Sequence, residues 1–250
     1  MTLVVAHRGA TALAPENTMV AFRLAVEAGA DAIECDVHLT ADGRLAVIHD
    51  EELDRTTDAS GRVAELTMAT IRKADAGARF AAPDGSTPFR DTGLRVPTLN
   101  EVLRWLPEGI GLVVEVKARA AVEPTIAALH GARVRTAGQV VLISFDEATI
   151  EHAHQLDPGL PTGYLLVPMQ PIEPALTWAA EHGHRGVHPW EGDLGLDPAP
   201  VLAQARAYGL DVACYVVNDP DRMRLLAAYG VWAFVTDDPA LARATLGPRP

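Results

Sequence analysis

The chain lacks several features that define whole classes of protein. No stretch of its 250 residues approaches the ~20 consecutive apolar residues that a membrane-spanning helix needs. The first residues also lack the basic start and the long apolar run of a secretory signal. We therefore expect a cytoplasmic protein without stable membrane association.

Cysteine and clustered positive charge are scarce as well. The two cysteines, Cys35 and Cys214, each lie in an apolar strand-like run, where a reduced thiol packs as a small hydrophobic group. The formal net charge is -12, and lysines and arginines form no cluster with interleaved aromatics. This pattern disfavours a disulfide framework and a nucleic-acid partner. A small anionic substrate remains compatible, because a bound cation and a few basic side chains can reverse the local charge.

Runs rich in β-branched residues recur along the chain and alternate with alanine-rich segments of helical spacing, which is the pattern of repeated βα units. A hydrophobic content of 48% is ample for a large core. The candidate strands cover 3–7, 32–37, 45–49, 111–116, 139–144, 162–167, 185–189, 211–217 and 232–236. The candidate helices cover 16–29, 98–105, 121–131, 146–156, 172–182, 198–208, 219–229 and 238–245.

The strand at 45–49 is the one that does not fit an eight-stranded barrel. Only a short segment containing the tight-turn pair Asp42-Gly43 separates it from the strand at 32–37. Parallel strands need a crossover of about a dozen residues or more, so this run must return as a hairpin. The sequence therefore predicts an α/β fold, a TIM (β/α)8 barrel spanning 1–250 as one domain. The aperiodic stretch at about 51–97 is expected to form a small insertion over the barrel mouth.

Active sites of TIM barrels lie at the carboxyl ends of the strands, and the first two strand ends here are polar. His7 and Arg8 follow the first strand and suit proton transfer beside an anion, although either residue alone could simply solvate a loop. In the second strand, the period of two places Glu34, Asp36 and His38 on one face. Two carboxylates on an inward face need a cation or a basic partner.

The third barrel strand adds a further acid, Glu115, with Lys117 on the same face. Oxygen ligands from Glu34, Asp36 and Glu115 suit a hard cation such as Mg²⁺ or Ca²⁺ better than zinc. Alternatively, Lys117 could neutralise Glu115 without a metal. The hairpin return ends in His49, which brings a second histidine to the rim and supplies a possible acid/base partner for the first.

These motifs resemble the glycerophosphodiester phosphodiesterases. The resemblance covers nearly the full chain and rests on HRG at 7–9, PENT at 15–18, IECDVHLTADGRLAVIHDEELDRTT at 33–57 and EVK at 115–117. Weaker matches are ISFD at 143–146, CYVVND at 214–219 and FVTDDP at 234–239. The site it implies has metal ligands Glu34, Asp36 and Glu115, catalytic histidines His7 and His49, and phosphate contacts Arg8 and Lys117.

The resemblance also implies a reaction. It is the metal-dependent hydrolysis of a small glycerophosphodiester, such as glycerophosphocholine or glycerophosphoethanolamine, to sn-glycerol 3-phosphate and an alcohol. We assign His7 to the attacking group and His49 to the leaving oxygen, and the reverse also fits. The attacking group is water or the 2-hydroxyl of the glycerol. Tyr215 stands where relatives often carry tryptophan and would form an aromatic wall of different size, which leaves the head-group preference open.

Residues near other strand ends carry weaker expectations. Glu16 and Asn17 are expected to organise the first loop, and Thr18 to cap the following helix. His188 and Trp190 could line the substrate pocket or simply pack.

Three alternative functions remain. A histidine-rich phosphatase would show paired His-x-His ligands at the first strand end, where only His7 stands. A related phosphodiesterase acting on sphingomyelin or lysophospholipids would need an apolar approach to a bilayer, and no basic amphipathic helix is present. A non-catalytic barrel that binds phosphate esters would be expected to lose a histidine or a carboxylate, and none of these residues is missing.

Overall fold

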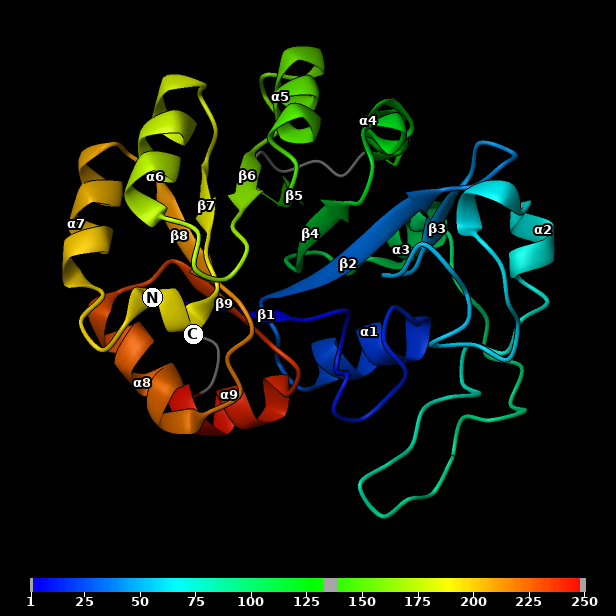
Figure 1. Cartoon of the computed structure of the whole chain (residues 1–250). Helices are drawn as coiled ribbons and strands as arrows, with labels where there is room; N and C mark the ends of the chain where they lie inside the picture. Colours follow the sequence, from blue (N-terminus) through cyan, green and yellow to red (C-terminus); the bar gives the residue numbers. More distant parts are fainter. Residues whose placement is uncertain (1, 133–138, 248–250) are drawn as a thin grey trace.

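The computed structural model describes residues 2–132 and 139–247. Eight parallel strands form a closed barrel with helices around it (Figure 1). The barrel strands are β1 (Leu3–Ala6), β2 (Ala32–Leu39), β4 (Gly111–Val116), β5 (Val140–Ser144), β6 (Thr162–Leu165), β7 (Gly186–His188), β8 (Asp211–Cys214) and β9 (Ala233–Thr236). β1 pairs with both β2 and β9, which closes the barrel. The predicted TIM barrel is thereby confirmed.

The ninth strand, β3 (Leu45–Val47), lies outside the barrel and pairs antiparallel with β2. Leu39 faces Leu45 and Val37 faces Val47 in this hairpin. The run at 45–49 is therefore the hairpin return expected from the short turn. The strand ends earlier than predicted, at Val47, and His49 lies in the bend that follows.

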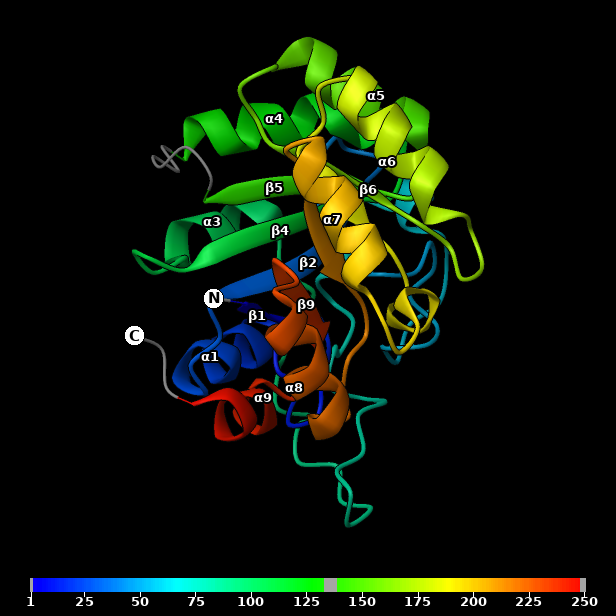
Figure 2. The ribbon, with the colours of Figure 1, turned by 90° about the vertical axis from the view of Figure 1, so that its left-hand side faces the viewer.

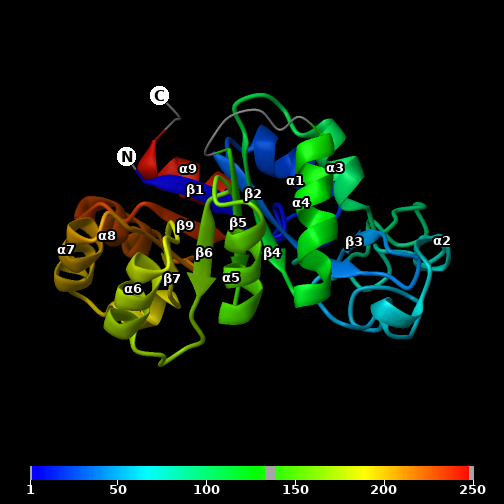
Figure 3. The ribbon, with the colours of Figure 1, turned by 90° about the horizontal axis from the view of Figure 1, so that it is seen from above.

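An outer ring of helices covers the barrel, as Figures 2 and 3 show from two further directions. The helices are α1 (Met19–Glu27), α3 (Leu99–Trp105), α4 (Val122–Gly131), α5 (Glu147–Leu156), α6 (Ile172–Glu181), α7 (Ala199–Ala207), α8 (Pro220–Tyr229) and α9 (Pro239–Leu246). Shorter elements are α2 (Met68–Ile71) and the 3-10 turns Val63–Glu65, Arg119–Ala121 and Glu191–Leu194.

The helix predicted at 16–29 begins later, at Met19, because Thr18 is its N-cap. The Thr18 hydroxyl accepts a hydrogen bond from the Ala21 N–H, 3.3 Å away. Asn17 has a φ of 55°, outside the helical range, and its side chain points elsewhere. Glu16, Asn17 and Thr18 therefore all precede the first helical residue, Met19.

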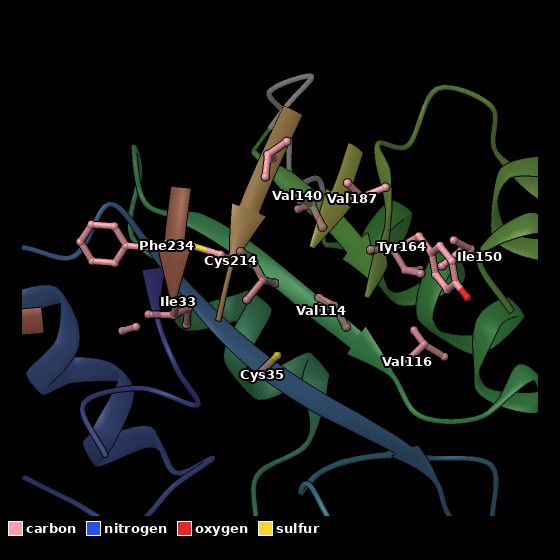
Figure 4. Packing of buried hydrophobic residues seen from close by; sticks show 14 of the residues in the cluster. Ile33, Cys35, Val114, Val116, Val140, Ile150, Tyr164, Val187, Cys214 and Phe234 are labelled. Atoms are coloured by element: carbon pink, nitrogen blue, oxygen red, sulfur yellow. The ribbon is translucent and has the colours of Figure 1, made fainter. Parts of the chain in front are cut away.

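Side chains of most barrel strands alternate between two separate apolar clusters. The outward residues of β2 and β4 pack beneath the helices, as Figure 4 shows for Ile33, Cys35, Val114 and Val116. The inward residues form a smaller cluster within the barrel, whose members include Val5, Ala32, Val113, Val141, Ile143, Leu165, Ala213, Ala233 and Val235. Both cysteines are buried and free, as expected.

The inward cluster explains where the charged residues lie. Ala32 and Val113 belong to this apolar plug, and the next inward positions along the same strands are Glu34 and Glu115. The plug therefore fills the amino-terminal part of the barrel, while carboxylates occupy the layer above it. This layering places the polar side chains at the carboxyl ends of the strands.

The stretch 51–97 packs mainly against β3. Its apolar residues Leu53, Val63, Met68 and Ile71 form a third cluster with Ile48. Figures 1 and 3 show most of the segment beside the barrel, next to β3, and not across its mouth as expected. The composition of the segment predicted an insertion but not the surface against which the insertion packs.

Among the described ranges, no helix combines the length and apolar character that crossing a bilayer requires.

Gly9 offers a test of how tightly the first strand end is fixed. Its φ is 92°, and an added Cβ would come within 2.7 Å of Ala21 in α1. Gly43 has a similar φ of 70° with nothing within 4 Å. A left-handed alanine costs about 1–2 kcal/mol at either site, whereas crowding should cost Gly9→Ala a further ~1–3 kcal/mol. Urea unfolding of the two variants measures the difference, and equal losses would contradict it.

Candidate active site

Three carboxylates meet at the top of the barrel. Glu34, Asp36 and Glu115 are 4%, 0% and 8% exposed, and one oxygen of each lies within 4.8 Å of those of the others. Asp36 and Glu115 are direct partners in the pairing of β2 with β4. Glu34 stands on the same face of β2, two residues earlier. The strand register therefore brings together the three residues predicted as metal ligands.

Two basic side chains contact this group. Lys117 Nζ donates a hydrogen bond to Glu115 Oε1 and lies 2.8 Å from Asp36 Oδ1. Arg8 Nε is 3.2 Å from Asp36 Oδ2, and the Arg8 backbone N–H donates to Glu34 Oε2 at 2.8 Å. The direct neutralisation of Glu115 by Lys117, considered from sequence as an alternative to a metal, is thus present in this structure.

The two cations do not balance the three acids. Burial and the nearby Asp36 raise the pKa of Glu115 to about 7, and burial followed by Asp36 raises the pKa of Glu34 well above its usual range. Burial acts on Asp36 in the same direction, but Lys117 and Arg8 outweigh it and hold the pKa of that carboxyl below its usual range. The site therefore holds one firmly ionised carboxylate between two that resist ionisation.

A divalent cation fits this donor set. Asp36 Oδ1 is buried and accepts no hydrogen bond, although Lys117 is within ion-pair distance. Three carboxylate groups that share a space of this size relieve their repulsion by binding a hard cation, which prefers oxygen ligands. Glu34, Asp36 and Glu115 are the residues that would hold it.

Asn17 fixes the central carboxylate from the side. Its Nδ2 donates to Asp36 Oδ2 at 2.7 Å, and its Oδ1 accepts from the Asp36 N–H at 3.3 Å. The expected role of this residue in the first loop therefore takes the form of a clamp on Asp36. A buried carboxylate that is held at both backbone and side chain has little freedom to rotate.

The two histidines stand at separate sides of the carboxylate group, and each contacts an aspartate through Nδ1. His7 Nδ1 lies 2.7 Å from Asp237 Oδ1, at the end of β9. His49 Nδ1 lies 2.6 Å from Asp50 Oδ1. In each case Nε2 is the ring nitrogen that does not contact the aspartate.

The surroundings of these aspartates differ in charge. Asp237 accepts hydrogen bonds from two neutral groups, Thr11 Oγ1 at 2.9 Å and Asn218 Nδ2 at 2.6 Å. Asp50 instead faces Arg55, whose Nε donates to its Oδ2 at 2.6 Å. Asp50 therefore has a cationic partner besides His49, whereas the other side-chain partners of Asp237 are neutral.

Arg55 also ties the insertion to the first loop. Its guanidinium donates to both carboxylate oxygens of Glu16, at 2.7 and 2.8 Å. Glu16 in turn accepts from Arg8 Nη1 at 3.0 Å. This chain of ion pairs runs along the rim from the Arg8 side to the His49 side.

Two hollows open on the two sides of the carboxylate group. One, of about 440 Å³, is lined by His7, Arg8, Thr11, Ala12, Glu16 and Asp237. The other, of about 610 Å³, is lined by His38, His49, Asp50, Glu51, Glu115, Lys117, Ser144, Phe145 and Asp146.

The remaining predicted residues lie at the rim or in the interior. The Tyr215 hydroxyl donates to the Leu166 carbonyl oxygen, and its ring meets Phe145 edge-on at 5.9 Å. Tyr215 therefore offers a ring edge and face to a ligand but no free hydroxyl. Trp190 is partly exposed beside Tyr215, whereas His188 is buried with its ring against Gly163.

Sequence reasoning did not single out Asp237, Asp50, Arg55 or Asn218. Asp50 follows His49 directly, and Asp237 follows a strand end. Their positions in the sequence could therefore have identified both as candidate site residues. Arg55 and Asn218 lie within the motifs at 33–57 and 214–219, but their contacts depend on how distant loops approach one another.

Comparison with known proteins decides the family. The family model described as "Glycerophosphoryl diester phosphodiesterase family" matches residues 7–241. The chain belongs to this family. A glycerophosphodiester phosphodiesterase of Bacillus subtilis (strain 168) is 36% identical over 256 residues, covering 96% of this chain and 84% of the relative. The resemblance seen in the sequence motifs is therefore confirmed.

Solved structures of the family share the barrel. A glycerophosphodiester phosphodiesterase from Agrobacterium tumefaciens str. C58 has a TM-score of 0.84 at 29% identity, covering 98% of this chain and 100% of its own. A phosphodiesterase from Oleispira antarctica, solved with the product sn-glycerol-3-phosphate, has a TM-score of 0.84 at 25% identity, covering 98% and 97%. The chain is thus an enzyme of the phosphodiesterase class.

The raised pKa values predict how cation affinity depends on pH. A cation must displace the proton from Glu115, whose pKa is about 7, and from Glu34. Affinity for Mg²⁺ should therefore fall steeply from roughly pH 8 to pH 6, with proton release on binding. Calorimetric titration in two buffers of different ionisation enthalpy measures both. His130→Ala, at an exposed site on α4, should leave the profile unchanged, and a flat profile for the unmodified chain would contradict the charge account.

Proposed function

We propose that this enzyme hydrolyses small glycerophosphodiesters, such as glycerophosphocholine or glycerophosphoethanolamine, to sn-glycerol 3-phosphate and the free alcohol. The supporting observation is the placement of two histidine–aspartate pairs on either side of a buried carboxylate group that also carries Arg8 and Lys117. Turnover would require a divalent cation, with Mg²⁺ and Ca²⁺ as the candidates. A role in recovering glycerol phosphate from lipid head-group diesters follows from this substrate class.

The chain's own cations would bind the phosphate. Arg8 and Lys117 both border the hollows and reach the carboxylate group, so they are placed to contact non-bridging phosphate oxygens. The bound divalent cation supplies a further positive charge where negative charge develops at phosphorus. Phe145 and Tyr215 would pack against the glycerol carbons.

The environments of the histidines favour the reverse of the first assignment. Burial, together with Lys117 and Arg8, lowers the pKa of His49, which favours the neutral ring that a general base requires. His7 instead contacts Asp237, whose other side-chain partners are neutral, and it takes the remaining role beside the leaving oxygen. His49 would accept the proton of the attacking hydroxyl, from water or from the glycerol 2-position. His7 would protonate the leaving oxygen.

Two leaving groups distinguish these roles. With glycerophosphocholine, His7→Ala and His49→Ala should each reduce kcat by about 10²–10⁴. With the p-nitrophenyl diester of glycerol phosphate, the leaving oxygen needs no proton, so His7→Ala should regain most of its rate while His49→Ala does not. Product release in a steady-state assay measures both series.

His130→Ala serves as the matched control, since this histidine is exposed and pairs with Asp157 outside the site. Recovery of His49→Ala instead of His7→Ala would reverse the roles. Near-normal turnover of both variants on both substrates would overturn two-histidine catalysis.

A second candidate substrate class is suggested by an apolar rim. Most of the exposed large hydrophobic residues stand in loops that follow barrel strands, at the same end as the active site. These are Leu13, Phe145, Val167, Met169, Trp190 and Leu196. Such a rim could hold the acyl chain of a lysophospholipid whose phosphodiester enters the site.

The rim predicts a selective effect on such substrates. Met169→Ser combined with Leu196→Ser should lower kcat/KM for monomeric lysophosphatidylcholine by about 10-fold or more, as two apolar contacts are lost, without changing that for glycerophosphocholine. Tyr208→Ser is the control, because Tyr208 is exposed away from the rim. Equal effects on both substrates would exclude a lipid role for the rim.

A further inference from the structure

A second group of possible metal ligands lies at the opposite end of the barrel. Glu151 is in α5, His182 is the C-cap of α6, and His184 lies in the loop before β7. One side-chain ligand atom of each lies within 4.8 Å of the others. Since β7 begins at Gly186, this cluster is at the amino ends of the strands, away from the carboxylate group of the active site.

Two atoms in the cluster are buried without a hydrogen-bond partner. They are His184 Nε2 and Glu151 Oε2, which lie 3.5 Å apart, within ion-pair distance of each other but without hydrogen-bond geometry. The His184 side chain is fully buried, and the other oxygen of Glu151 accepts from Gln155 Nε2 at 2.9 Å. Buried polar atoms of this kind normally have partners, so the pair points to a ligand between them.

The ring of His184 is held in position from two sides. Its Nδ1 lies 2.8 Å from Thr162 Oγ1, and Trp178 stacks on its face at 4.7 Å. With Nδ1–H donating to Thr162, Nε2 carries the lone pair and points toward Glu151. This is the arrangement in which a second hydrogen bond orients a metal-binding imidazole.

We propose that Glu151, His182 and His184 bind a transition-metal ion of the Zn²⁺ type, which links α5 to the loop between α6 and β7. Nε2 of His184 and Nδ1 of His182 lie 3.5 and 3.9 Å from Glu151 Oε2. Ligands about 2.0–2.1 Å from a tetrahedral zinc are separated by roughly 3.4 Å, so small movements suffice. Two nitrogens and one oxygen suit Zn²⁺, whereas the all-oxygen group at the active site suits a hard cation.

A further histidine lies near this group. His154 follows Glu151 by three residues on α5, and its ring lies 5.4 Å from that of His184, edge to face. Its Nε2 approaches Gly183, the residue between the other two histidines. A water would complete the tetrahedron. The site is structural in character, because its residues are remote from the hollows that border the catalytic histidines.

Zn²⁺ binding to the full chain tests the proposal, with the active site removed as a competitor by Asp36→Asn. Equilibrium dialysis should find one tightly bound Zn²⁺ per Asp36→Asn chain. Adding His182→Ala, or separately Glu151→Gln, should weaken this binding by at least about 100-fold, as expected for loss of a ligand. Both changed side chains are partly exposed, so these variants should fold.

Co²⁺ gives a second readout, since a four-coordinate site with nitrogen ligands yields strong visible absorption. The Asp36→Asn chain should show this band, and the added His182→Ala should abolish it. His130→Ala in the same background is the matched histidine control and should retain the band. Weak binding to the Asp36→Asn chain, or tight binding that survives both His182→Ala and Glu151→Gln, would overturn the proposal. Because turnover is not measured, the result is independent of the proposed function.

Discussion

The burial of three carboxylates beside only two basic side chains is the constraint on which the active end of this barrel depends. Glu34, Asp36 and Glu115 are held within a few ångströms of one another by the strand register, and they have little access to water. Arg8 and Lys117 stabilise Asp36 as an ion but leave the two glutamates with raised pKa values. The site is therefore preorganised for additional positive charge.

The fold maintains this arrangement by keeping apolar and polar layers separate. Ala32 and Val113 close the barrel below the carboxylates, and alternate residues of the same strands pack under the helices. The charged layer consequently sits on a rigid floor and cannot relax by sinking into the barrel. Asn17 and the Glu16–Arg55 contact restrain it from the loops above. The positions of His7 and His49 therefore depend on contacts along the whole rim and not on single neighbours.

The sequence was informative wherever a short-range rule governs the structure. The period of two placed Glu34 and Asp36 together, and the Asp42-Gly43 turn identified β3 as a hairpin return. Cap chemistry at Thr18 likewise marks the start of α1. These features depend on neighbouring residues in one chain segment, so a single sequence contains the information.

Contacts between distant segments could not be read in this way. The pairing of His7 with Asp237 and that of Arg55 with Glu16 depend on loop conformations that no periodicity encodes. The insertion was recognised from its composition, but its position beside β3 follows from an apolar surface around Ile48. The proposed histidine roles also required the structure, since they rest on the burial and the charged neighbours of His49.

The two ends of the barrel present opposite donor chemistry. Oxygen ligands gather at the carboxyl ends of the strands, and imidazoles gather at the amino ends near His184. This difference would favour metals of different character at the two ends of the barrel.

The most direct measurement is the release of glycerol 3-phosphate from glycerophosphocholine by protein stripped with EDTA and then supplied with Mg²⁺ or Ca²⁺. The charge imbalance predicts negligible release by the stripped protein and recovery with one of the two cations. Undiminished release in EDTA would contradict the account, because Arg8 and Lys117 would then suffice to balance the carboxylates and the phosphate.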